Sequence, residues 1–322
     1  MPSHFRPEIV TAYFLCHGLW TVIPRQLQEN FADMADCGFN AVAISFSESE
    51  MTYARRAFEL QVRLAHAAGL RVFVVPSRIG GRLAGAPLMP SPWLCTHPEA
   101  QAGNPWLPLA CVEHEPFRQW ARDFMTTLVT DYPIDGIVWD EPKATDYVTR
   151  HPDAAAKYGP DPTREQMMDG FVDWLTDLTG HCLRLRPSLV VTLFLQHTDP
   201  DYFTRRAAAI PGIACFGYDG NLARQSTFHE APAWHKYRIE TTWPRTQAEA
   251  AAAGKKTFSL VENMLMPAEA IPEYEANLES YLAGPLPDHL GLYYYAHNNE
   301  DPDRTHAVTR RLMRRRLVAN NA

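Results

Sequence analysis

The chain has 322 residues, of which 46% are hydrophobic and 21% are charged, a composition typical of a globular protein with a large core. Its 30 Lys and Arg residues against 37 Asp and Glu residues give a net charge of −7, which argues against nucleic-acid binding. The sequence shows neither an apolar run of about 18 residues nor a charged-then-apolar N-terminal segment. We therefore expect no membrane span and a cytoplasmic location.

The cysteines and a cluster of arginines allow further predictions about metal sites, disulfides and a surface helix. The six cysteines lack the CxxC spacing of zinc or iron–sulfur sites, and we expect neither a metal nor another cofactor. Cys95 and Cys111 fall in one predicted loop and could pair in an oxidising compartment. The cluster Arg310, Arg311 and 314–316 is interleaved with apolar residues, which predicts a solvated helix face.

Short β-rich segments recur along the chain, and most are followed by an amphipathic segment. We predict strands at 9–16, 41–46, 71–76, 137–139, 189–195, 213–216, 258–261 and 290–295. Apolar periodicity predicts helices at 24–37, 50–68, 116–130, 163–185 and 302–318. Gly38 and Gly69 follow the first two helices at the position where glycine ends a helix.

Two long connections interrupt this alternation, 77–113 after the third strand and 143–162 after the fourth. Loops of such length inside a compact domain are usually functional or disordered. The first contains Trp93 and Trp106, which disfavours disorder and indicates a lid or substrate platform.

Eight β/α units with one composition throughout predict a single-domain (β/α)8 barrel over residues 1–322. An open doubly wound sheet would place GxGxxG after its first strand, and His17-Gly18-Leu19 does not fit that spacing. In such barrels the active site lies at the C-terminal ends of the strands. Polar residues gather at those ends here: Ser45, Glu48, Arg78, Asp140, Glu141, His197, Tyr218, Asp219, Glu262, Asn263, His297 and Asn299.

The fourth strand ends on two adjacent acids, Asp140 and Glu141, before Pro142. Neighbouring carboxylates repel, so they must be solvated or hydrogen-bonded. A helix N-cap with a first-turn acid is the structural alternative. Glu262 stands alone in the apolar stretch 259–266, where a structural acid would need a buried cationic partner. Strands four and seven face each other across a barrel, so Glu141 and Glu262 are placed to bracket a glycosidic bond.

The Asp140-Glu141-Pro142 ending resembles the Asn-Glu-Pro ending of the retaining clan-A barrel glycosidases. That resemblance implies that Glu141 is the acid/base and Glu262, at the end of strand seven, the nucleophile. This chain departs from the pattern at Asp140, where the clan usually has an Asn that contacts the sugar 2-hydroxyl.

A second resemblance covers residues 71–142 and rests on Pro76-Ser77-Arg78, His97-Pro98-Glu99 and the segment 132–137. These motifs are similar to the bacterial glycosyl-hydrolase-like barrels, which carry Asp-Gly-Ile/Val-x-x-Asp in strand four. That resemblance makes Asp140 the leading acid. Both resemblances imply the same fold and reaction class, and they leave Asp140 and Glu141 as alternatives.

Aromatic residues near strand ends and in long loops suggest a sugar site, because Trp and Tyr rings stack on sugar faces; core packing is the alternative for each ring. The expected substrate-binding residues are Asp219, Tyr218, Trp139, His197, Arg78, Glu48, Tyr294 and Asn299.

The sequence thus predicts a glycoside hydrolase that acts on a small-molecule or oligosaccharide substrate. The clan-A resemblance implies that it retains the anomeric configuration. A non-catalytic carbohydrate-binding barrel is the first alternative, since it would keep the aromatic residues without needing acids on two facing strands. A metal-dependent hydrolase is the second. It would need more histidines at strand ends than His17 and His197 supply.

Overall fold

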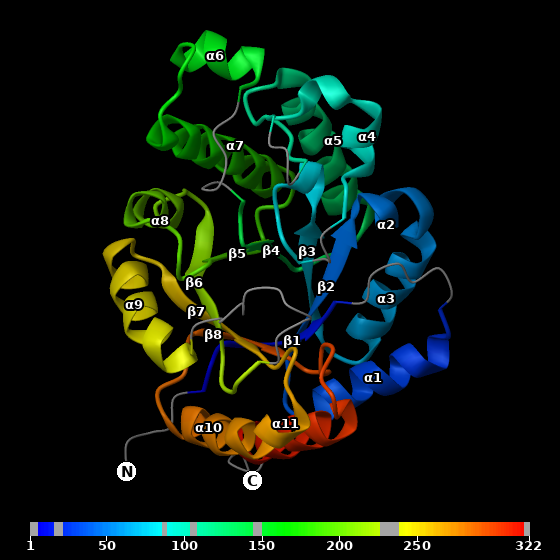
Figure 1. The fold of residues 1–322 in the computed structure, drawn as a ribbon. Coiled ribbons are helices and arrows are strands. Elements are labelled where there is room, and N and C mark those ends of the chain that lie inside the picture. Colours follow the sequence, from blue (N-terminus) through cyan, green and yellow to red (C-terminus); the bar gives the residue numbers. More distant parts are fainter. Residues whose placement is uncertain are drawn as a thin grey trace.

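The computed structural model describes residues 6–15, 22–85, 89–103, 108–143, 150–225 and 238–318. Eight parallel strands pair in sequence order, and β8 closes on β1, so the predicted (β/α)8 barrel is confirmed. Figure 1 shows the strands in the middle of the molecule with helices around them. The strands are β1 Ile9–Phe14, β2 Ala41–Ser47, β3 Arg71–Ser77, β4 Gly136–Asp140, β5 Val190–Leu195, β6 Ile213–Asn221, β7 Lys256–Glu262 and β8 His289–Tyr293.

Most helices follow the strands in the alternation that the sequence predicts. They are α1 Pro24–Asp36, α2 Glu48–Tyr53, α3 Arg55–Ala67, α4 Pro92–Thr96, α5 Glu115–Asp131, α6 Pro152–Tyr158, α7 Arg164–Leu185, α8 Asp201–Ala208, α9 Ile239–Ala252, α10 Ile271–Ala283 and α11 Pro302–Leu317. None of the described helices is long and apolar enough to cross a membrane.

Predicted and observed boundaries differ most at the second helix and the sixth strand. The helix expected at 50–68 is broken at Ala54, whose φ of −130° is not helical. Its first part begins earlier, at Glu48, because Ser47 and Glu50 form a capping box there. The sixth strand was expected to end at Phe216 but pairs with β7 as far as Asn221. Tyr218 and Asp219 therefore lie within β6 rather than after it.

Side chains of the strands alternate between the barrel interior and the helix layer. One buried cluster consists of strand residues and includes Tyr13, Val138, Phe194, Leu260 and Tyr293, and it fills the interior. Their sequence neighbours belong to the larger cluster that the helices share. Gly217 allows β6 to approach β7 and α9 closely, since a Cβ there would lie 1.8 Å from the Phe258 carbonyl oxygen and 3.1 Å from Thr246 Cγ2.

His289 crosses the N-terminal end of the barrel interior. Its Nε2 lies 2.8 Å from Thr11 Oγ1 on β1, and its Nδ1 lies 3.0 Å from Thr192 Oγ1 on β5. The ring also contacts the rings of Phe73 and Phe258, at centroid distances of 5.2 and 4.8 Å. Burial lowers the pKa of His289 to about 3, so it is neutral at physiological pH.

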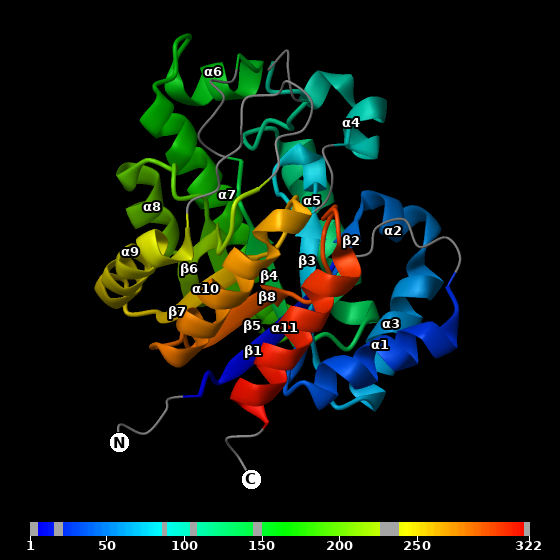
Figure 2. The ribbon, with the colours of Figure 1, turned by 60° about the horizontal axis from the view of Figure 1, so that its bottom comes forward.

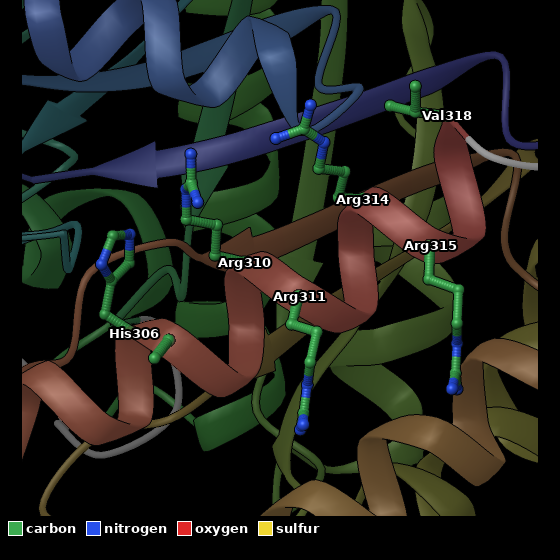
Figure 3. Close-up of a pocket in the computed structure, with 7 residues that line it drawn as sticks. His306, Arg310, Arg311, Arg314, Arg315 and Val318 are labelled. Carbon is green, nitrogen blue, oxygen red and sulfur yellow. The ribbon is translucent and has the colours of Figure 1, made fainter.

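The arginines of α11 lie on the surface, beside a shallow hollow of about 570 Å³. Arg310 pairs with Asp33 at 2.6 Å, Arg311 with Glu275 at 2.6 Å and Arg315 with Glu279 at 2.5 Å. Figure 3 shows Arg310 and Arg314 directed to one side of the helix and Arg311 and Arg315 to the other. These ion pairs with acidic groups of α1 and α10 support the expected solvated helix face.

Candidate active site at the C-terminal mouth of the barrel

Three carboxylates point into the barrel from the ends of separate strands. Asp140 lies two residues after the interior residue Val138 on β4, and Glu262 two residues after Leu260 on β7. Asp219 lies four residues after Cys215 on β6. The period of two in a strand therefore turns all three side chains inward. Each residue is at most 5% exposed.

Tyr13 on β1 is the group that these carboxylates share. Burial raises the pKa of its phenol well above the ordinary value, and the charges of Asp140, Asp219 and Glu262 raise it further. Within the described part of the chain, the Tyr13 hydroxyl has no hydrogen-bond partner. A protonated phenol thus lies among acids from three strands. Tyr13 is not among the site residues predicted from the sequence. The one signal for it is its position two residues after Thr11 in β1, which places both side chains on the same face of the strand.

Arg78 supplies a positive charge beside the fourth strand. Burial lowers the pKa of its guanidinium, and the carboxylates of Asp140 and Glu141 oppose that change. The cation is therefore close enough to both acids to offset part of their mutual repulsion. Arg78, which the sequence suggested as a substrate-binding residue, thus lies near the acids that end β4.

Glu141 directly follows β4 and is 7% exposed. Its Oε2 accepts hydrogen bonds from Lys143 Nζ and from Gln196 Nε2, both at 2.8 Å. The ammonium stabilises the negative charge of this carboxylate. Neither Lys143 nor Gln196 was selected from the sequence, because nothing in their local patterns indicates contact with Glu141.

The loop after β3 returns to cover the fourth strand. The Ala84 N–H donates to the Asp140 carbonyl oxygen at 2.8 Å. A Cβ on Gly85 would lie 2.8 Å from Ser77 Oγ and 3.3 Å from Asp140 Oδ2, and the φ of this glycine is +81°. Only glycine allows the backbone to approach Asp140 so closely in that conformation.

Backbone strain is concentrated at this end of the barrel. Among the described residues, those other than glycine with positive φ are Arg78 (54°), Glu141 (37°), Leu265 (55°) and Asn298 (51°). They follow β3, β4, β7 and β8 within a few residues. Each such conformation costs about 1–3 kcal/mol, and such residues cluster at functional sites.

Three aromatic residues selected from the sequence face the helix layer instead of the mouth. Trp139 Nε1 donates to Thr179 Oγ1 on α7 at 3.0 Å. The Tyr218 hydroxyl donates to Glu249 on α9, and the Tyr294 hydroxyl donates to Asp33 on α1. The structure does not bring these rings to the carboxylates. Their burial matches the core-packing alternative.

Two polar residues selected from the sequence connect loops. Glu48 accepts hydrogen bonds from the Gly80 N–H, Ser91 Oγ and the Trp93 N–H, and so holds the loop after β3. Asn299 accepts from the Met266 N–H at 3.0 Å and donates to the Asn263 carbonyl oxygen at 2.7 Å, which joins the loops after β7 and β8.

His197 lies on the α9 side of the barrel, where its carbonyl oxygen accepts from Arg245 Nη1 at 2.7 Å. Burial and the Arg245 charge lower the pKa of its ring. Cys95 is a free thiol, so the disulfide considered between Cys95 and Cys111 does not form. Cys16, His17, Trp20 and Trp106 lie outside the described residues.

Several solved structures named as glycosidases have a fold similar to this barrel. A β-galactosidase from the Antarctic haloarchaeon Halorubrum lacusprofundi matches with a TM-score of 0.67 and 11% identity, over 96% of this chain and 58% of that one. The catalytic domain of a β-amylase from Paenibacillus polymyxa matches with a TM-score of 0.60 and 8% identity, over 95% and 98% of the two chains.

An endo-β-1,4-mannanase from Thermotoga petrophila matches with a TM-score of 0.59 and 9% identity, over 99% of this chain and 78% of that one. The chain spans little more than half the length of the β-galactosidase, and at these identities the likeness concerns the fold. No family model and no curated protein matches the sequence.

Proposed function

We propose that this protein is a glycoside hydrolase that cleaves an oligosaccharide or a smaller glycoside by carboxylate catalysis. The observation that carries the proposal is the convergence of Asp140, Asp219 and Glu262 on Tyr13 at the strand ends. Glycosidic cleavage needs two carboxyl groups on opposite sides of the bond. Acids on β4 and β7 can flank a substrate in the mouth, and Arg78 offsets part of their charge.

In the proposed reaction Glu262 is the nucleophile and Glu141 the acid/base. Glu141 donates a proton to the glycosidic oxygen as Glu262 attacks the anomeric carbon and the C–O bond breaks. Glu141 then takes a proton from water, whose oxygen displaces Glu262 from the glycosyl–enzyme. Asp140 and Asp219 hold substrate hydroxyls. The overall result is retention of configuration.

The contact between Lys143 and Glu141 is relevant to the competing assignment, in which Asp140 rather than Glu141 is the general acid. A general acid must carry a proton before the leaving oxygen departs, and an ammonium at 2.8 Å opposes protonation of Glu141. If Glu141 is the acid, substrate binding must separate it from Lys143. If Asp140 is the acid, Glu141 keeps its ion pair throughout turnover.

The test measures turnover of a panel of 4-nitrophenyl glycosides and of galacto- and manno-oligosaccharides by the wild type and the variants Glu262→Gln, Glu141→Gln and Asp140→Asn. We expect kcat to fall by about 10²–10⁴-fold in Glu262→Gln and Glu141→Gln, with folding unchanged. Near-full activity of Glu262→Gln would show that Glu262 is not the nucleophile. A larger loss in Asp140→Asn than in Glu141→Gln would transfer the leading role to Asp140.

Glu59→Gln is the matched control, because this α3 residue is exposed and paired only loosely with Arg56 at 3.9 Å. It should retain full turnover. Oligosaccharide binding by the wild type without turnover on any substrate would favour the non-catalytic binding barrel. A cytoplasmic location is also part of the proposal, and the free thiols of Cys37, Cys95, Cys182 and Cys215 support it.

A further inference from the structure

A second cluster of polar side chains lies away from the carboxylates of the mouth. It consists of His114, which precedes α5, and of His151 and Asp153 in the segment that leads into α6. Figures 1 and 2 both show α6 at the same end of the molecule as α4, where the long connections after β3 and β4 lie. The cluster therefore links these two connections.

The three side chains present their ligand atoms close together. His114 Nδ1 lies 2.7 Å and His151 Nδ1 3.7 Å from Asp153 Oδ2, and the ligand atoms are all within 4.8 Å of one another. The imidazole centroids are 4.9 Å apart. At the bond lengths of about 2.0–2.2 Å typical of zinc, ligand atoms around one tetrahedral ion lie about 3.3–3.6 Å apart. The side chains must therefore move by about an ångström to bind one ion together.

Hydrogen bonds already orient His151 as a metal ligand would be oriented. Its Nε2 lies 2.8 Å from the Glu99 carbonyl oxygen, so Nε2 carries the proton and donates it. Ligating histidines commonly donate their second ring N–H to a backbone carbonyl or carboxylate. His151 Nδ1 then has its lone pair on the Asp153 side, where it accepts the Asp153 N–H at 3.1 Å.

The two histidines of the cluster are more buried than the aspartate, so one side of the cluster is open to solvent. The His151 and His114 side chains are 5% and 15% exposed, whereas that of Asp153 is 46% exposed. Two imidazoles thus form a sheltered wall, and the carboxylate faces solvent. A water molecule can complete the coordination from that open side.

We propose that His114, His151 and Asp153 bind a divalent transition-metal ion such as Zn²⁺. Two imidazoles and one carboxylate are a donor set that suits zinc and its neighbours better than Mg²⁺. On binding, the His114 proton moves from Nδ1 to Nε2, and the Asp153 carboxylate exchanges its bond to His114 for one to the ion. His151 Nδ1 likewise exchanges the Asp153 N–H for the ion, and that N–H turns to solvent. The ion joins the connection after β3 to that after β4, so its role is to hold these two connections together.

The experiment titrates Zn²⁺ into the full chain, freed of metal with EDTA, by calorimetry, with Mg²⁺ in parallel. We expect one Zn²⁺ per chain, little Mg²⁺ binding, and a Zn²⁺-dependent rise in Tm. His114→Gln and Asp153→Asn should each weaken Zn²⁺ binding by at least about 10–100-fold. His66→Gln is the matched control, since His66 pairs with Asp135 at 2.8 Å outside the cluster, and it should bind Zn²⁺ as the wild type does.

Unchanged Zn²⁺ affinity in folded His114→Gln and Asp153→Asn would overturn the proposal and place the ion elsewhere, for example on the carboxylates of the mouth. Failure of the wild type to bind at micromolar Zn²⁺ would also overturn it. If the variants misfold, the visible absorption spectrum of Co²⁺ added to the wild type tests the site instead. The strong visible absorption of four- or five-coordinate Co²⁺ supports the site, and the weak spectrum of the hydrated ion contradicts it. None of these outcomes depends on glycosidase activity.

Discussion

The surroundings of Tyr13 differ from ordinary core packing. Its phenol is buried among the charges of Asp140, Asp219 and Glu262, which keep it protonated over the physiological pH range. A protonated phenol can donate a hydrogen bond to one of these carboxylates or to a substrate oxygen. We predict that Tyr13→Phe lowers kcat/KM by about 10–100-fold on the glycoside that the wild type cleaves best, because a preorganised donor is lost.

The same substitution should leave the free energy of unfolding within about 1 kcal/mol of the wild type, because no described residue accepts a hydrogen bond from this hydroxyl. Steady-state kinetics and urea unfolding of one preparation separate the two effects. A fully active variant would mean that Tyr13 only fills the floor of the mouth. A strongly destabilised one would mean that its hydroxyl has a structural partner.

At the scale of elements, one side chain of α2 organises the connection after β3. Glu48 Oε1 accepts from the Gly80 N–H at 2.9 Å and from Ser91 Oγ at 2.6 Å, and Oε2 accepts from the Trp93 N–H at 2.7 Å. An amide in its place turns one acceptor into a donor. We predict that Glu48→Gln lowers the free energy of unfolding by about 2–3 kcal/mol, as expected when hydrogen bonds to a buried charged group are lost.

Limited proteolysis and urea unfolding test this role. The variant should be cut faster between residues 89 and 103 than the wild type. Glu59→Gln serves again as the control and should match the wild type in both measurements. Equal protease resistance of the Glu48→Gln variant would show that the neighbouring packing, such as the stack of Trp93 on Trp120 at 5.0 Å, holds the loop without Glu48.

For the whole molecule, the barrel was predictable because each strand shows its own apolar run, whereas the site was predictable only in part. Asp140 and Glu262 end their strands, and their inward direction follows from the alternation. The same alternation turns Trp139 and Tyr218 outward, because each immediately precedes an inward acid. The role of Glu48 was not predictable, since its partners lie 32–45 residues along the chain. Contacts such as Lys143 and Gln196 with Glu141 likewise depend on how separate loops meet.

The stability of the whole barrel should depend on pH, because His289 is buried in its interior as a neutral ring. Its folded pKa of about 3 lies below the value of 6.5 for an unperturbed histidine, so below pH 6.5 the unfolded chain binds a proton that the barrel excludes. This residue therefore removes about 1.4 kcal/mol of stability per pH unit as the pH falls from 6.5 toward 3. We predict that the stability advantage of the wild type over His289→Gln, measured by urea unfolding between pH 7.5 and 4.5, shrinks at that rate below pH 6.5. Parallel curves for the two proteins would show that the unfolded chain and the barrel bind this proton equally, and that the Thr11–His289–Thr192 contacts do not hold the ring neutral.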